Sequence, residues 1–495
     1  MKYLKIYALL ALLLMAGGVT MQAQNSKSNR ELPEQYWVDL VTEQPEGYVV
    51  DANGDVHIYS AEALAWLSVV SNGFNGQEID DYEGRTVCLE DNIDLSGALW
   101  LPIAGKVDVS AVFHGYFDGK EHVIEGLTMT SGYPYFYMMG LFGELSGATL
   151  SNIVLTKGYY EAQLTGGNYE GGFLACAVRD ESLVNHCFVD CEMHIKSGMS
   201  PFVYECEHST ISNCLVHSPL IRAEGSLDGI PGILVAIAYP KSHILNCASI
   251  IERMDWSENC GLVGIFNYGI IENCYGYIGE CIDFGGYGGG PAPRNGVTGS
   301  NGPTGEIYNC YYNRLRNYVG SSYYIEMDDQ PAYSNLGIIQ NAVPYTEEGR
   351  GHWKLTEEIT FELENGTVST NDLLDALNFK VRLLYDEALL DWCDTGMGFD
   401  NQQLPVFCNF DVTETSENTT SVDQVEVYPN PARAKVTIEG LEAAKVQVYN
   451  ALGQLVKTVQ CSNEINVSGL SEGVYLLRIT NAEGKSYTER LVVKE

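Results

Sequence analysis

The segment Ile211-Ser212-Asn213-Cys214 decides the fold, because it recurs as Ile244-Leu245-Asn246-Cys247, Ile271-Glu272-Asn273-Cys274 and Ile307-Tyr308-Asn309-Cys310. A looser copy is Leu183-Val184-Asn185-His186-Cys187. The five cysteines are separated by 27, 33, 27 and 36 residues. A repeat of this length indicates a solenoid in which each copy contributes one coil.

A second signature of glycine followed by apolar residues alternates with the first. Its copies are Gly140-Leu141-Phe142-Gly143, Gly172-Phe173-Leu174, Gly232-Ile233-Leu234 and Gly261-Leu262-Val263-Gly264. The apolar segments are too short for helices and are broken by Gly, Asn and Ser, so each coil is expected to consist of two or three short strands. We therefore predict a mostly β chain built on a right-handed parallel β-helix with caps at both ends.

The Asn and Cys positions are expected to form ladders along this β-helix. Asn tolerates left-handed backbone angles, and its amide can hydrogen-bond to the Asn one coil away. A bend at Asn213 would turn both Ile211 and Cys214 inward. The predicted ladder residues are Asn185, Asn213, Asn246, Asn273 and Asn309, with Cys187, Cys214, Cys247, Cys274 and Cys310.

Composition changes along the chain divide it into predicted segments. These are a signal peptide at 1–24, an N-terminal cap at 31–85, repeats at 86–330, a C-terminal cap at 331–410, a linker at 411–423 and a small domain at 424–495. Ser60 is expected to cap a short helix, and Leu373, Leu377 and Val381 indicate a helix within 371–392. The glycine-rich stretch 285–305 is predicted to be a loop.

Charge excludes one class of partner. The formal net charge is -37, and it resides before residue 424, because the last 72 residues contain eight Lys or Arg and eight Asp or Glu. Phosphate would be repelled, so nucleic acid is not an expected partner. No apolar run after the signal reaches the length of a membrane helix, so an integral membrane protein is not expected.

Seven short alternating segments follow the linker and predict an antiparallel, Ig-like β-sandwich. They are 425–428, 435–438, 445–449, 454–459, 464–467, 474–480 and 486–493. This region resembles the C-terminal sorting domain of the type IX secretion system of Gram-negative bacteria. The resemblance rests on Tyr428-Pro429-Asn430-Pro431, the turn at Leu452-Gly453, and Gly473 with Tyr475. It implies passage through the periplasm and outer membrane, with the secretion machinery and surface lipopolysaccharide as partners.

The body resembles the GLUG-repeat class of bacterial surface β-helices, through Gly261-Leu262-Val263-Gly264, Gly140-Leu141-Phe142-Gly143 and the Asn-Cys copies. The segment from Phe113 to Ile124 also resembles the entry segment of such proteins. This resemblance bears on the fold more than on any activity.

Cysteine and histidine residues between 187 and 217 suggest a zinc site, but strand parity argues against it. His194 lies seven residues from Cys187, and His217 lies three from Cys214, so the members of each pair face opposite sides of an extended chain. Buried thiols and surface histidines are the favoured interpretation. Some of the 14 cysteines could form disulfides, but their pairing is not predictable. No metal, cofactor or catalytic residue is predicted.

Two functional hypotheses stay open. The first is a non-catalytic surface adhesin or ligand-binding protein that recognises a glycan or a host or matrix protein. The second is a polysaccharide lyase or glycoside hydrolase, for which Asp180, Asp190, Glu205 and Glu207 are acidic candidates without distinguishing features. Aromatic residues that could stack on sugars are Tyr133, Tyr135, Phe136, Tyr137, Tyr159 and Tyr160, although strand packing explains most such residues.

Overall fold

The computed structural model describes most of the chain between residues 30 and 494. The described ranges are 30–162, 170–195, 198–223, 232–255, 261–282, 296–313, 318–319, 332–347, 353–363, 366–384, 389–393, 404–408, 426–428, 432–439, 443–450, 455–460, 464–470, 473–481 and 486–494. Two compact units comprise residues 1–347 with 353–359, and 348–352 with 360–495. The predicted signal peptide and the linker at 411–423 lie outside the described residues.

The first unit begins with α2 (Trp37–Leu40), the hairpin of β1 (Tyr48–Val50) and β2 (Val56–Ile58), and α3 (Ala61–Ser71). Helix α3 confirms the predicted start, because the Ser60 hydroxyl accepts a hydrogen bond from the Ala63 amide at 3.2 Å. Strand β2 already pairs in parallel with β3 (Thr86–Leu89). Coiling therefore begins near Val56, inside the range predicted as a cap.

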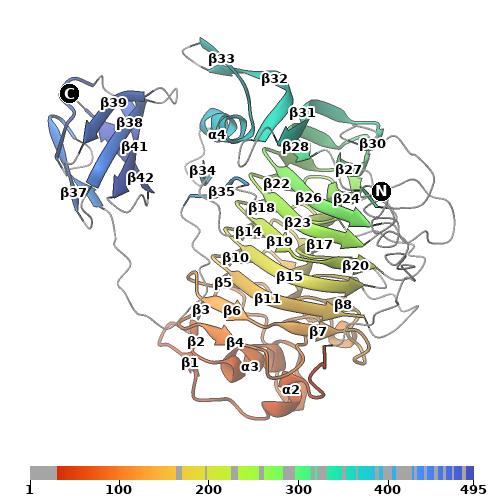
Figure 1. Cartoon of the computed structure of the whole chain (residues 1–495). Coiled ribbons are helices and arrows are strands. Elements are labelled where there is room, and N and C mark those ends of the chain that lie inside the picture. Colours follow the sequence, from red (N-terminus) through yellow and green to blue (C-terminus); the bar gives the residue numbers. More distant parts are fainter. Residues whose placement is uncertain are drawn as a thin grey trace, which may run out of the picture. The chain divides into compact units, whose positions relative to one another are not determined.

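A large sheet of parallel strands forms two adjacent sides of the coils (Figure 1). One row consists of β5 (Tyr116–Asp118), β10 (Thr149–Ser151), β14 (Leu183–Asn185), β18 (Thr210–Ser212), β22 (His243–Leu245), β25 (Ile270–Glu272) and β28 (Glu306–Asn313). The other consists of β4 (Ile93–Asp94), β6 (Val123–Glu125), β7 (Thr128–Thr130), β11 (Val154–Glu161), β15 (Phe188–Ile195), β19 (Leu215–Ser218), β20 (Ile221–Ala223), β23 (Ala248–Asp255), β26 (Tyr275–Ile282) and β29 (Tyr318–Val319). Each strand pairs with its counterpart on the next coil.

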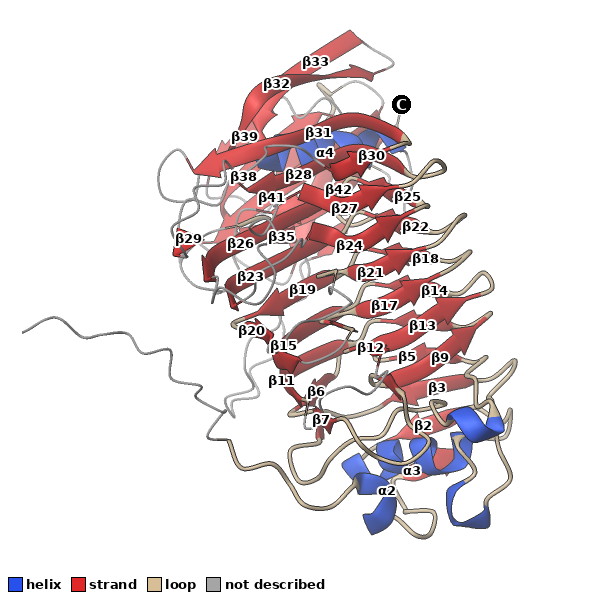
Figure 2. Ribbon diagram, turned by 90° about the vertical axis from the view of Figure 1, so that its right-hand side faces the viewer, coloured by secondary structure: helices blue, strands red, loops and turns tan. Residues whose placement is uncertain are grey.

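A seven-stranded parallel sheet forms another side, with one strand from each coil (Figure 2). Its members are β9 (Phe142–Ser146), β13 (Ala175–Arg179), β17 (Val203–Cys206), β21 (Val235–Ala238), β24 (Gly261–Asn267), β27 (Gly296–Asn301) and β30 (Ala332–Asn335). A short parallel sheet contains β8 (Met138–Met139), β12 (Glu170–Gly172) and β16 (Met199–Ser200). The prediction of a loop over 285–305 was wrong for 296–301, because β27 pairs with β24 and β30.

The parallel stacking ends with β31 (Ile338–Glu347), which pairs in parallel with β28 and antiparallel with β32 (Trp353–Leu363). The β-solenoid therefore extends from about Val56 to Tyr345, beyond the predicted range of 86–330. Its interior is one continuous apolar cluster, in which side chains such as Val184, Ile211 and Ile244 are completely buried. Parallel strands that bury one face against such an interior require this apolar repeat.

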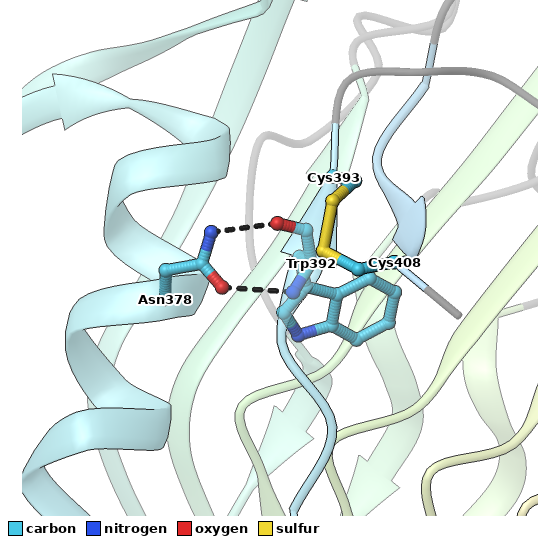
Figure 3. The surroundings of a disulfide bond; sticks show 4 residues. All are labelled: Asn378, Trp392, Cys393 and Cys408. Carbon is cyan, nitrogen blue, oxygen red and sulfur yellow. Dashed lines mark hydrogen bonds between the residues drawn. A yellow bond between two sulfur atoms is a disulfide. The ribbon is translucent and has the colours of Figure 1, made fainter. Parts of the chain in front are cut away.

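The second unit contains β33 (Gly366–Asp372), α4 (Leu373–Leu384), β34 (Trp392–Cys393) and β35 (Val406–Phe407). Helix α4 confirms the predicted helix but ends at Leu384, and Trp392 lies in a strand. A disulfide joins Cys393 to Cys408 (Figure 3). The Asn378 side chain donates to the Trp392 carbonyl and accepts from the Trp392 amide, both at 2.8 Å, and so links the helix to the disulfide-bonded strand pair.

The C-terminal segment forms two antiparallel sheets with the seven predicted strands in their expected positions. The three-stranded sheet contains β36 (Glu426–Tyr428), β37 (Lys435–Glu439) and β40 (Glu464–Asn466). The four-stranded sheet contains β38 (Ala443–Asn450), β39 (Leu455–Gln460), β41 (Gly473–Asn481) and β42 (Ser486–Val493). Val436, Val446 and Leu477 belong to one shared, fully buried apolar core.

Candidate functional site

An asparagine ladder runs along the bends of the solenoid. Asn273 donates from its Nδ2 to Asn246 Oδ1 at 2.8 Å, Asn246 donates to Asn213 Oδ1 at 2.8 Å, and Asn213 donates to Asn185 Oδ1 at 2.7 Å. Asn213, Asn246, Asn273 and Asn309 have φ angles of 51° to 54°, in the left-handed region that Asn tolerates. These residues therefore fix a sharp bend, and the amides of Asn213, Asn246 and Asn273 tie neighbouring coils together. The prediction that Asn309 joins this ladder was wrong, because its Nδ2 is buried without a hydrogen-bond partner.

One predicted member of this ladder occupies a different backbone position. Asn185 pairs in register with Ser212, and the residue with the left-handed φ at this bend is His186, at 53°. His186 contacts Asn152 Oδ1 through Nδ1 at 2.9 Å, and Asn152, with φ of 54°, occupies the bend one coil earlier. Asn185 still accepts from Asn213, so the ladder continues although the bend residue is a histidine.

A second asparagine ladder was missed from the sequence. On the seven-stranded sheet, Asn267 donates to Asn301 Oδ1 at 2.8 Å, and Asn301 donates to Asn335 Oδ1 at 2.9 Å. The three residues are spaced by 34, and the Gly269 and Gly337 amides donate to the side chains of Asn267 and Asn335. The available signal was asparagine at a spacing of 34, with glycine two residues after Asn267 and Asn335 and directly after Asn301.

The ladder cysteines form a column inside the solenoid. Cys187, Cys214, Cys247, Cys274 and Cys310 are completely buried. The backbone amides of Cys214 and Cys247 each point at the sulfur of the next coil, at 3.4 Å. Burial raises the pKa of Cys214, Cys247, Cys274 and Cys310 well above that of a free thiol. These groups therefore pack as small apolar side chains.

The strands separate the cysteines and histidines that suggested a zinc site, because the cysteines face the interior and the histidines face carboxylates outside it. The expectation of surface histidines was wrong for His194 and His217, which are buried. Cys187 and Cys191 belong to the apolar core, whereas His194 contacts Glu192 Oε1 at 2.7 Å. Cys206 is buried, and His208 lies 3.8 Å from Glu181. Among the described residues, no group of three or more His, Cys, Asp or Glu side chains is arranged to hold a metal ion.

The outer face of β15, β19 and β23 carries the best-defined polar centre. His217, almost fully buried, contacts Asp190 Oδ1 through Nδ1 at 2.6 Å and Glu252 Oε1 through Nε2 at 3.1 Å. Burial opposes the charged imidazole, but the hydrogen bonds to Asp190 and Glu252 outweigh it and raise the pKa of His217. We call Asp190, His217 and Glu252 the His217 centre.

A second set of charges follows on the same face. His194 lies in register with Arg222, and Arg222 lies in register with Asp255. Arg222 binds Asp255 at 2.9 Å, and Arg253 binds the same carboxylate at 2.7 Å. The hydrogen bond from His194 lowers the pKa of Glu192. The charges on this face are therefore organised as ion pairs between and within coils.

The acidic candidates from the sequence do not converge. Asp190 belongs to the His217 centre, whereas Glu205 lies on the seven-stranded sheet, where it binds Arg179 at 2.6 Å and accepts from Tyr239 at 3.2 Å. Asp180 accepts from Ser146 at a turn. Glu207 is exposed at the end of β17. Asp190 alone of these four shares a histidine with another carboxylate.

The aromatic candidates divide into packing residues and exposed ones. Phe136, Tyr159 and Tyr160 are buried, and Tyr133 packs edge-on against Tyr36, with ring centroids 4.6 Å apart. Tyr135 and Tyr137 remain 56% and 49% exposed, which distinguishes them from the strand-packing tyrosines.

The sorting-domain residues are partly described. Tyr428 is exposed at the end of β36, and Gly473 and Tyr475 lie on β41, where Tyr475 is buried. Pro429, Asn430, Pro431, Leu452 and Gly453 lie outside the described residues. Within the described part of the chain, no helix is long and apolar enough to cross a membrane.

Comparison with known proteins identifies the C-terminal segment. Residues 426–494 match the family described as secretion system C-terminal sorting domain. The chain is 35% identical over 91 residues to an ulvan lyase of Nonlabens ulvanivorans, which is 17% of each chain. It is 31% identical over 74 residues to beta-agarase D of Zobellia galactanivorans, which is 15% of this chain and 16% of the agarase. The chain thus spans less than a fifth of these curated relatives. No solved structure matches significantly.

The match and the strand pattern agree in position. The seven strands from Glu426 to Val493 fill the matched range. Residues 426–494 are a type IX sorting domain, and the protein that carries them is secreted or displayed at the cell surface.

Proposed function

We propose that the protein is a non-catalytic adhesin or ligand-binding protein, exported by the type IX machinery and attached to surface lipopolysaccharide. The observation that carries this proposal is the ion pairing of the outer face. His194, His217 and Arg222 are each held by a carboxylate from the same or an adjacent coil. Groups held in this way stabilise a rigid surface, and a rigid surface suits recognition of a glycan or of a host or matrix protein.

Binding by the full mature chain tests this proposal. The protein would be immobilised and presented with a glycan array and with purified matrix proteins, and any bound glycan would be examined for cleavage. Saturable binding without cleavage is expected. Absence of binding to every ligand, or release of shortened glycan, would contradict the proposal.

The sorting function has its own test. Deletion of residues 424–495 is expected to leave the protein in the periplasm, whereas the full chain reaches the surface. Protease shaving of intact cells followed by immunoblotting of cell fractions measures the difference. Surface display of the truncated protein would refute the role of the domain in export.

A polysaccharide lyase or glycoside hydrolase is the second candidate, and the His217 centre favours it. A histidine between two carboxylates is a group that can transfer a proton near neutral pH. The names of two partial relatives, an ulvan lyase and a beta-agarase, fit the same class. If the protein cleaves a polysaccharide, His217→Gln is expected to abolish the products seen by size-exclusion chromatography.

We also infer finer features of the fold. The solenoid is expected to wind right-handed, because parallel strands joined by crossovers follow that hand. The two sheets of the sorting domain are expected to form an Ig-like sandwich, since they share one core. We also propose that the body is a GLUG-repeat β-helix and that the segments of the chain have the predicted boundaries. An experimental structure of the secreted protein would test these proposals together.

A further inference from the structure

Four exposed apolar side chains lie on two segments of the first unit that are hydrogen-bonded to each other, the 3-10 helix η2 (Val107–Val109) and the loop around Tyr135, and we call them the exposed apolar patch. The residues of this patch are Val107, Val109, Tyr135 and Tyr137, which are 44%, 38%, 56% and 49% exposed. The Val107 amide donates to the Tyr135 carbonyl at 3.1 Å, so the loops are joined at this point. Exposed apolar side chains gathered in one place indicate an interaction site.

The loop that carries the two tyrosines is fixed from beneath. Phe136, between them, is completely buried and stacks on Phe74 with centroids 5.8 Å apart and planes inclined by 6°. Tyr133 packs edge-on against Phe136 at 5.8 Å. The Tyr137 carbonyl accepts from the Glu170 amide at 2.9 Å. The two exposed rings are therefore presented by a backbone that is already ordered.

Tyr135 adopts a backbone conformation that its side chain disfavours. Its φ is 67°, in the left-handed region where Gly and Asn are tolerated far better than an aromatic residue. Strained residues of this kind concentrate at binding and catalytic sites, where the strain positions the side chain. Asn or Gly would adopt this φ at lower cost. Tyr82 has a φ of 62° but is completely buried, whereas the Tyr135 ring is exposed and so is available to a ligand.

We propose that Tyr135 and Tyr137 form a binding platform for the rings of an uncharged polysaccharide, a proposal that rests on the ligand-binding function above. Flat aromatic faces pack against the apolar C–H faces of sugar rings. The net charge of -37 repels polyanions, so an uncharged polysaccharide is favoured over a sulfated one. A protein partner is a poorer fit, because a stable protein interface covers about 800 Å² on each side and the patch contains four side chains.

The test uses the mature full chain and matched pairs of oligosaccharides. The probes are uncharged hexasaccharides of glucose, galactose, mannose or xylose, each compared with its sulfated form by biolayer interferometry. At least one uncharged probe is expected to bind, and its sulfated form is expected to bind about tenfold more weakly at low salt. Tighter binding of the sulfated form, or no binding by any probe, would overturn the proposal.

Four variants locate the site. Tyr135→Asn and Tyr137→Ala are each expected to weaken binding about tenfold, whereas Tyr135→Phe keeps the ring and changes it by less than about twofold. Tyr59→Ala is the control, because Tyr59 is also 49% exposed but lies at the other end of α3 from Phe74. It is expected to bind like the wild type.

Tyr135→Asn separates function from folding. Asn accepts the left-handed φ, so the urea midpoint of this variant is expected to equal or exceed that of the wild type while binding falls. If binding of the chain to a glycan or protein persists unchanged in Tyr135→Asn and Tyr137→Ala, the platform is wrong and the broader binding function stands. A patch that mediates only self-association or protein capture would also overturn it.

Discussion

On the same solenoid strands, an inward-facing position repeats one residue type from coil to coil, whereas an outward-facing position does not. Inside, one position is cysteine on five coils, at Cys187, Cys214, Cys247, Cys274 and Cys310. Three residues further along four of these coils, the outward position is Asp190, His217, Ile250 and Tyr277, all in register. The buried environment is alike on these five coils and accepts one small residue, whereas Ile153 and Ala342 occupy the position on the coils before and after them. The outer surface carries no such constraint, so it is where coils acquire different roles.

The largest expected effect comes from placing the same charge on the two sides of one strand. Ile211 on β18 is completely buried, whereas its neighbour Thr210 is partly exposed. Ile211→Asp is expected to cost more than about 4 kcal/mol of unfolding free energy, because an unpaired carboxylate enters the apolar interior. Thr210→Asp is the matched control, with an expected change of less than about 1 kcal/mol. Urea unfolding measures both, and equal losses would contradict the assignment of faces.

The asparagine ladder gives the next largest effect. Asn246 holds a φ of 54° and bonds to Asn213 and Asn273. Asn246→Ala loses both amide links and also strains the left-handed backbone, with an expected cost of about 3 kcal/mol. Asn246→Gly loses the links alone, and we expect about 1 kcal/mol less destabilisation. If Gly is no better than Ala, the bend does not depend on the left-handed conformation.

The outer His217 centre predicts a smaller, pH-dependent effect. Because the pKa of His217 is raised in the folded protein, its contribution is complete below the unfolded pKa of about 6.5 and is lost as pH rises through the folded value. His217→Gln is therefore expected to lower stability by up to about 2 kcal/mol at pH 5.5 and by less at pH 8.5. His122→Gln is the control, because His122 is not part of the His217 centre. Urea midpoints of the variants across this pH range give the result, and a constant difference would exclude a titrating His217.

The smallest effect concerns the coil with a histidine at the bend. His186 has a φ of 53°, which Asn adopts more readily. His186→Asn restores the residue of the neighbouring coils and is expected to stabilise the protein by about 0.5 kcal/mol. A loss of stability would show that the contact of His186 with Asn152 matters more than the backbone preference.

The sequence predicts the repeated interior residues better than the residues of the outer face. Asn246 and Cys247 were found from the sequence because burial and bending impose the same residue at each repeat. The His217 centre was not found, since Asp190 and Glu252 are 27 and 35 residues away and form no local motif. Aligning the coils on their cysteines would have placed Asp190 beside His217, because each lies three residues after a ladder cysteine. Glu252 lies two residues after Ile250, the register partner of His217, so the same alignment places Glu252 on this outer face.

Other differences have equally local causes. Asn185 was placed in the ladder by residue type, but the extra residue between it and Cys187 moves the bend to His186. The stretch 285–305 was assigned to a loop from its glycines, yet Val297 and Thr298 are buried in β27. In the sorting domain, turn residues separate strands clearly, and the predicted strands coincide with β36 to β42 within two residues.

The most direct test of the division between a structural interior and a functional exterior is thiol accessibility in the native protein. Iodoacetamide labelling followed by peptide mass spectrometry reports each cysteine separately. Among the free cysteines that the structure describes, the partly exposed Cys88 is expected to react first, while Cys187, Cys214, Cys247, Cys274 and Cys310 stay unmodified until the protein is unfolded in urea. Labelling of these five cysteines in the folded protein as fast as Cys88 would contradict an inward-facing column and the coil alignment that depends on it.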